Sequence, residues 1–164
     1  RVYTPLNNSE KYTLVLMGRA DFGLLGSYNK YKQTPFETFH VGGDGMTGSY
    51  TYATETIGLR GYDNGALTPY SDGRAYTRFS MELHFPFLLQ PSSTIYGLAF
   101  VEGGNAWTSL ENFNPFSLKR SAGVGVRIFL PMIGLMGIDW AYGFDKVQGE
   151  KGGGHFHFIL GQEF

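Results

Sequence analysis

Hydrophobic and polar residues alternate along most of the chain with a period of two. Between Ala75 and Phe87 the odd positions are apolar except for Thr77, whereas the even positions carry Arg78, Glu82 and His84. Such alternation is typical of a β-strand whose two faces meet different surroundings. Similar segments recur, and we predict six strands, at about 12–25, 75–88, 93–108, 118–130, 133–145 and 154–164. The pattern therefore predicts an all-β protein.

The connections between these strands alternate in length. NNSE, LQPSS and LPMIG are short, whereas the segments 39–74, 109–119 and 146–154 are longer and richer in glycine, asparagine and charge. Short turns on one side and long loops on the other are typical of outer-membrane barrels. Strands of roughly 10 residues or more can cross a bilayer when tilted. We therefore expect an antiparallel transmembrane β-barrel segment.

Composition fits this interpretation but leaves an alternative open. Charged residues make up 16% of the chain, below the ~25% of an average soluble domain. The polar strand faces carry isolated Arg, Glu, Asp and His among Gly and Ser, whereas Lys is confined to loops and strand ends. A soluble sheet would also alternate. An aromatic-rich soluble sheet that binds carbohydrate through Tyr and Trp is therefore the alternative from another class.

Several kinds of function are not expected. The net charge of −1 does not suggest nucleic-acid binding, and the absence of cysteine excludes thiolate metal sites. His155 and His157 share one strand face, but two ligands without a third acid do not make a metal site. No nucleophile motif is present. We therefore expect no enzyme, no cofactor and no metal, and no apolar run is long enough for a membrane-spanning helix.

Six strands are too few to close a membrane barrel, since bacterial barrels have at least ~8. Open edges in lipid would leave backbone groups unpaired at several kcal/mol each. The six strands are therefore expected to be part of a larger barrel.

The long loop and the strands after it carry ordered motifs. The loop reads FHVGG from Phe39, with the pair Gly42-Gly43, and then Leu59-Arg60-Gly61-Tyr62. It is followed by SMELHFP from Ser80, FVEGGNAW from Phe100, SAGVG from Ser121 and the terminal FHFILGQEF. Together these motifs resemble the outer-membrane β-barrel assembly family typified by BamA. The family more often has Val in place of Leu59 and Asp in place of Glu102.

The resemblance implies a sixteen-stranded barrel preceded by periplasmic POTRA domains. This chain, residues 1–164, would be its C-terminal part, with residues 26–74 as the signature loop and the POTRA domains and the first ten strands absent. In that family the loop folds back into the lumen. By resemblance, Arg60 at its tip would bind Glu82 and Glu102, while Gly61 permits close approach and Tyr62 adds stacking.

The resemblance also implies a function. The last strand, with Phe156, Phe158, Leu160, Gly161 and Phe164, would form a seam that opens laterally, so that a client strand can pair with its edge. The expected role is assembly and insertion of client outer-membrane proteins in a Gram-negative outer membrane. Its partners would be the lipid bilayer, client proteins and periplasmic assembly lipoproteins. Within the superfamily, a two-partner secretion or TamA-type translocase is the alternative.

Overall fold

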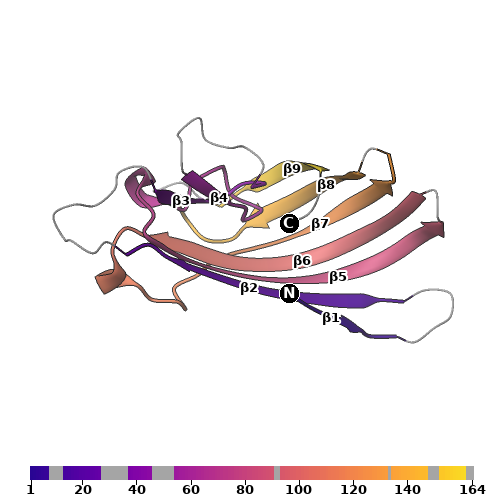
Figure 1. The fold of residues 1–164 in the computed structure, drawn as a ribbon, viewed down its shortest axis with the longest axis horizontal. Coiled ribbons are helices and arrows are strands. Elements are labelled where there is room, and N and C mark those ends of the chain that lie inside the picture. The colour runs from indigo at the N-terminus through magenta and orange to yellow at the C-terminus, as the bar shows by residue number, and fades with distance from the viewer. Residues whose placement is uncertain are drawn as a thin grey trace.

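The computed structural model describes residues 1–7, 13–26, 37–45, 54–90, 93–132, 134–147 and 152–161. Its main strands are β1 Val2–Pro5, β2 Val15–Leu24, β5 Ala75–Gln90, β6 Ser93–Trp107, β7 Lys119–Leu130, β8 Gly134–Gly143 and β9 Gly154–Gly161. They form one antiparallel, curved sheet in the order β1-β2-β5-β6-β7-β8-β9 (Figure 1). The sheet is open, because β1 and β9 lie at opposite ends of this order.

The predicted antiparallel all-β fold is confirmed, but the count of six strands is wrong. The six predicted segments correspond to β2 and β5 to β9. The seventh strand, β1, pairs with the first half of β2 through the register Tyr3↔Met17. All four residues of β1 are exposed and the strand ends at Pro5, so it is too short and too uniform to produce a recognisable alternation.

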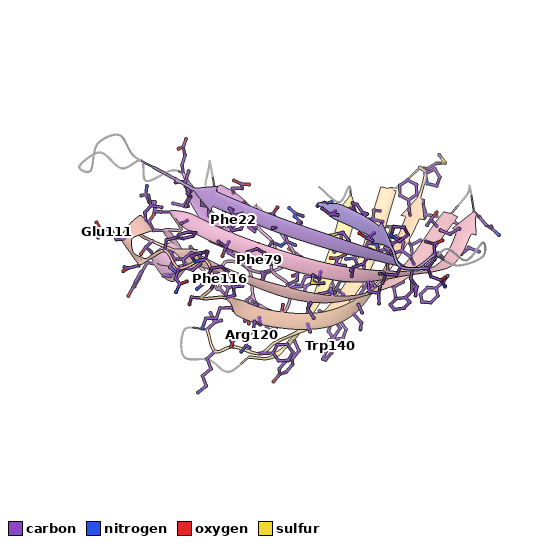
Figure 2. All side chains as sticks on the ribbon, turned by 90° about the horizontal axis from the view of Figure 1, so that it is seen from below. Phe22, Phe79, Glu111, Phe116, Arg120 and Trp140 are labelled. Atoms are coloured by element: carbon purple, nitrogen blue, oxygen red, sulfur yellow. The ribbon has the colours of Figure 1, made fainter. Side chains whose placement is uncertain are left out.

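The two faces of the sheet differ as the alternation predicts. The outer face carries exposed apolar side chains, such as Val124, Ile138 and Phe158. Phe22 and Phe79 lie on this face with ring centroids 5.4 Å apart (Figure 2). The other face, called the inner face below, carries Glu82, Asp139 and His157 together with other polar groups, and most of them are buried.

The long loop folds into a small unit over one end of the sheet. Within it, β3 (Thr38–Val41) pairs in parallel with β4 (Thr54–Ile57). Figure 1 shows β3 and β4 beside the main sheet, separate from its ladder. The sequence did not predict these two strands. They are four residues each, and their pairing depends on contacts outside any local pattern.

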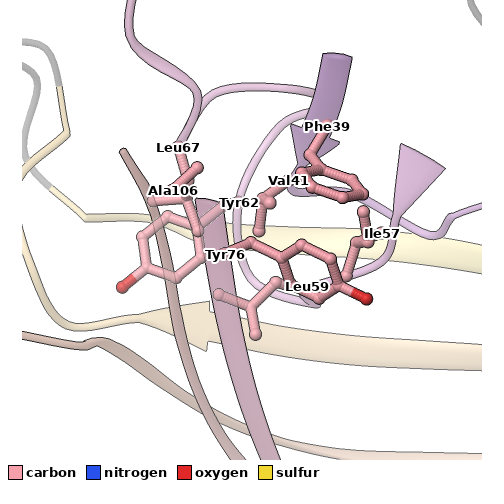
Figure 3. Close-up of a cluster of buried hydrophobic side chains, with 8 residues drawn as sticks. All are labelled: Phe39, Val41, Ile57, Leu59, Tyr62, Leu67, Tyr76 and Ala106. Carbon is pink, nitrogen blue, oxygen red and sulfur yellow. The ribbon is translucent and has the colours of Figure 1, made fainter. Parts of the chain in front are cut away.

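The loop has its own hydrophobic cluster, which joins it to the sheet. Figure 3 shows eight buried side chains that meet there: Phe39, Val41, Ile57, Leu59, Tyr62, Leu67, Tyr76 and Ala106. Tyr76 belongs to β5 and Ala106 to β6, so the cluster packs the loop against two strands. Burial of the larger of these side chains contributes ~1.5–3 kcal/mol each, which holds the described parts of the loop against the sheet.

Two short 3-10 helices complete the described structure, Pro69–Ser71 within the loop and Leu110–Asn112 after β6. Among the described residues, no helix is both long enough and apolar enough to cross a membrane.

Candidate functional site: a buried arginine at the loop tip

The loop reaches the inner face through a turn built on paired glycines. The amide of Gly43 donates to the carbonyl of Leu59 at 3.1 Å, and the amide of Gly42 donates to that of Ile57 at 3.0 Å. Gly42 has φ +130°, and a Cβ there would lie 2.4 Å from the carbonyl oxygen of Asp63. The turn therefore requires glycine for conformation and for space. The turn holds Leu59 in place, and the next residue, Arg60, therefore lies at the tip of the loop.

Arg60 projects from this tip into a group of three carboxylates. Its guanidinium donates to Glu82, to Glu102 at 2.6 Å and to Asp139 at 2.9 Å. These acids belong to β5, β6 and β8, so one side chain connects three strands of the sheet. The backbone amide of Arg60 also donates to Glu102, at 2.9 Å. The Arg60 side chain is only 6% exposed, which makes this a buried, charge-assisted network.

The carboxylates have further partners on the inner face. Glu102 accepts from Ser80 at 3.0 Å and from Arg78 at 3.2 Å. Asp139 accepts two bonds from the fully buried Arg127. Glu82 differs, because its second partner is the His84 ring at 2.9 Å and not a guanidinium group.

Charges in this network balance. Three carboxylates, of Glu82, Glu102 and Asp139, face three guanidinium groups, of Arg60, Arg78 and Arg127. Balance matters because an unpaired charge costs several kcal/mol to bury.

Arg60 remains charged despite its burial. Burial by itself lowers the pKa of Arg60, but the carboxylates of Glu102, Glu82 and Asp139 more than offset it and raise that pKa above its ordinary value. The loop therefore presents a positive charge to the three carboxylates of the sheet.

Aromatic support for Arg60 comes from the sheet. The guanidinium carbon lies 3.6 Å from the centre of the Phe100 ring on β6, a cation–π arrangement. The sequence predicted stacking from Tyr62 instead. Tyr62 packs in the loop's hydrophobic cluster, and its hydroxyl donates to the carbonyl of Arg120 at 2.6 Å. It therefore fastens the loop to the start of β7. Phe100 and Glu102 share the inner face of β6, and both contact the Arg60 guanidinium.

Gly61 allows the loop backbone to approach β7 and β8. It has φ +90°, and a Cβ there would lie 2.9 Å from the Cβ of Ser121 and 3.0 Å from the amide nitrogen of Gly143. Its amide donates to Nε2 of His157 on β9 at 2.9 Å. The tip therefore contacts strands from β5 to β9.

The structure places the predicted site residues in two groups. In the first group, Arg60 binds Glu82 and Glu102 on the inner face, and its neighbours Leu59, Gly61 and Tyr62 pack the loop against the sheet. The residues predicted for the seam lie along β9, where Phe156, Phe158 and Leu160 are exposed on the outer face. Gly161, with φ +111°, ends β9 opposite Leu135. Phe164 lies outside the described residues.

Sequence reasoning missed several residues of the site, among them Arg78, Phe100, Arg127, Asp139 and His157. Asp139 and Arg127 are among the isolated Asp and Arg residues of the polar strand faces, to which the sequence assigned no partner. The signal that could have found them is charge balance, since an isolated acid and an isolated arginine on inner faces each need a partner. No local pattern links Asp139 to Arg60, which is 79 positions away in the sequence.

A metal site on the inner face would need a group of suitable ligands. In the described parts of the chain, no three His, Cys, Asp or Glu residues are grouped so that they could bind a metal ion. A cavity of about 700 Å³ lies beside the network, lined among others by Arg19, Asp21, Glu55 and Arg78. Its charged lining indicates a polar interior on this side of the sheet.

Comparison with known protein families matches residues 1–164, the entire chain, to the Omp85 superfamily domain. No match was found among curated proteins.

Proposed function

The chain belongs to the Omp85 superfamily, and on that premise we propose that it is part of a factor that folds and inserts β-barrel proteins. Proteins of this superfamily reside in the bacterial outer membrane and act generally in protein assembly or translocation, without enzymatic activity. The alternative of a soluble carbohydrate-binding sheet does not fit a family of the outer membrane. The observation that carries the proposal is the loop docked on the inner face by Arg60, which binds carboxylates on β5, β6 and β8.

We propose that the seven-stranded sheet is a segment of a larger, sixteen-stranded barrel with POTRA domains in the same protein. The support is the open sheet, because backbone groups on an unpaired edge are costly in lipid. The signature loop would then lie inside the lumen, and the inner face would line it. In a Gram-negative outer membrane, periplasmic lipoproteins are the proposed assembly partners.

The outer face of the sheet is proposed to contact lipid. Ile138, in the middle of β8, is 52% exposed, and Ile138→Arg is expected to destabilise the protein in lipid vesicles by ~2–4 kcal/mol, as for arginine near the bilayer centre. Urea unfolding followed by tryptophan fluorescence measures the loss. The matched control is Phe116→Arg, because Phe116 is apolar and 83% exposed but lies in a loop. Equal, small losses at both positions would mean that this face is not in lipid.

The proposed mechanism uses the free edge of β9. Among the described strands, β9 pairs only with β8. A client strand could add to the other edge of β9 by backbone hydrogen bonds, which is β-augmentation. No covalent step is required, because the energy of client folding comes from pairing and from burial in lipid.

A cross-linking experiment tests this mechanism. The chain has no cysteine, so single-cysteine variants are unambiguous. Phe158→Cys on β9 is expected to form disulfides with cysteines in the terminal strands of a stalled client barrel. Val101→Cys is the control, since Val101 is similarly exposed on the outer face but lies on β6, which is paired on both sides. Equal cross-linking at both positions would contradict strand pairing at the seam.

The range of clients separates assembly from translocation. Depletion of an assembly factor should reduce many unrelated outer-membrane barrels, whereas loss of a two-partner secretion translocase should retain one secreted partner inside the cell. A TamA-type translocase should likewise affect a narrow set. Quantitative proteomics of outer membranes after depletion provides the comparison.

A further inference from the structure

One side chain joins the last strand to the docked loop. Nε2 of His157 accepts a hydrogen bond from the Gly61 amide at 2.9 Å, and His157 is 6% exposed. A ring nitrogen that accepts a bond carries no proton, so this imidazole is neutral and bears its proton on Nδ1. The geometry therefore requires one protonation state of His157.

This contact matters because β9 has few other restraints. Its backbone pairs with β8 alone among the described strands. The neighbouring inward side chain, His155, reaches the same loop, with Nδ1 3.2 Å from Oδ1 of Asp63. Two histidines of β9 thus contact two residues of the loop tip, Gly61 and Asp63.

We propose that His157 is a positioning residue that ties β9 to the docked loop, and that protonation of its ring releases the tie. A protonated Nε2 would present an N–H to the N–H of Gly61. Two donors cannot bond, and the buried amide of Gly61 would lose its acceptor. Loss of this hydrogen bond would leave β9 less tightly held against the loop, while the Arg60 network stays intact.

Charged groups face His157 from each element packed around it. These ionisable groups are Asp139 on β8, Asp44 in the turn after β3, Arg60 in the loop and His155 on β9. His155 differs from His157 in its partner, because its ring contacts the side chain of Asp63 and not a backbone amide. The two histidines can therefore be separated experimentally.

One consequence rests on the proposed function. Loss of the hydrogen bond between His157 and Gly61 would make the seam strand, β9, easier to displace. The contact itself can be measured without any client. A negative result in client insertion and a negative result for the tie are thus distinguishable.

The test is amide hydrogen exchange of the full protein in phosphatidylcholine vesicles, between about pH 8 and about pH 5, where imidazoles titrate. Protection factors remove the pH dependence of the intrinsic exchange rate. His157→Gln places an amide oxygen near the position of Nε2 and cannot titrate. His157→Phe removes the acceptor, and His155→Gln is the matched control on the same strand.

In the unmodified protein, protection of β9 and of the Gly61 amide is expected to fall on the order of tenfold on acidification, the size of one hydrogen bond lost at a buried donor. His157→Gln should keep protection high at both pH values, and His157→Phe should keep it low at both. His155→Gln should retain the pH dependence. An unchanged pH profile in His157→Gln would overturn the proposal, even if His157→Phe does not fold.

Discussion

Replacing Arg60 with alanine is expected to release the loop from the inner face and to lower the free energy of unfolding by about 3–5 kcal/mol, the usual cost of removing one partner from a buried ion pair. The reason is that Arg60 is the common partner of carboxylates on β5, β6 and β8. Urea unfolding in vesicles measures the loss of stability, and limited proteolysis of the loop measures its release.

The carboxylates are not expected to respond equally. Without Arg60, Glu102 still has Arg78 and Asp139 still has Arg127. Within the described part of the chain, the partner that remains for Glu82 is His84. Glu82→Gln should therefore restore more stability to the Arg60→Ala variant than Glu102→Gln or Asp139→Asn does. A double-mutant cycle gives these coupling energies.

Two further variants identify the cause of the loss. Arg60→Lys keeps the charge but lacks the planar fork of donors, so it should restore stability only in part. Arg120→Ala is the control, because Arg120 is paired with Asp145 but its side chain is 70% exposed, and it should have little effect. If Arg60→Ala were additive with each of the three acid replacements, Arg60 would not hold the loop.

The alternation in the sequence was sufficient to predict six of the seven main strands and the face on which their side chains lie. It worked because the outer and inner faces of each long strand have opposite polarity, as between Met81 and Glu82 on β5. It failed for β1, whose residues are all exposed, and for β3 and β4, which are only four residues each and pair through contacts outside any local pattern.

The site could be predicted only as far as its motifs extend. Arg60, Glu82 and Glu102 lie in motifs that resemble a known family, and the structure brings them together. Asp139 does not lie in such a motif, and His157 lies in the terminal motif without a role being assigned to it there. The contacts of both residues with the loop arise from the curvature of the sheet, which brings β8 and β9 towards the tip. Curvature is a property of the assembled strands and has no local sequence pattern.

Replacing Gly61 with alanine is expected to undock the loop tip while leaving every charge in place. Two costs add at this position. An alanine at φ +90° is strained by ~1–2 kcal/mol, and its Cβ would lie 2.9 Å from the Cβ of Ser121, which adds an overpacking cost of ~1–3 kcal/mol. The sum is about 2–5 kcal/mol, and it acts through backbone position alone.

Gly134→Ala separates the two costs. Gly134 has φ +96°, but a Cβ there would meet nothing within 4 Å, so only the conformational strain applies. Gly61→Ala should therefore destabilise the protein more than Gly134→Ala, and only Gly61→Ala should make the loop sensitive to protease. The difference in unfolding free energy between the two variants measures the close approach of the loop to β7 and β8. Equal losses, with the loop protected in both variants, would mean that the tip does not need this approach, and that the ionic contacts of Arg60 suffice to hold the loop in place.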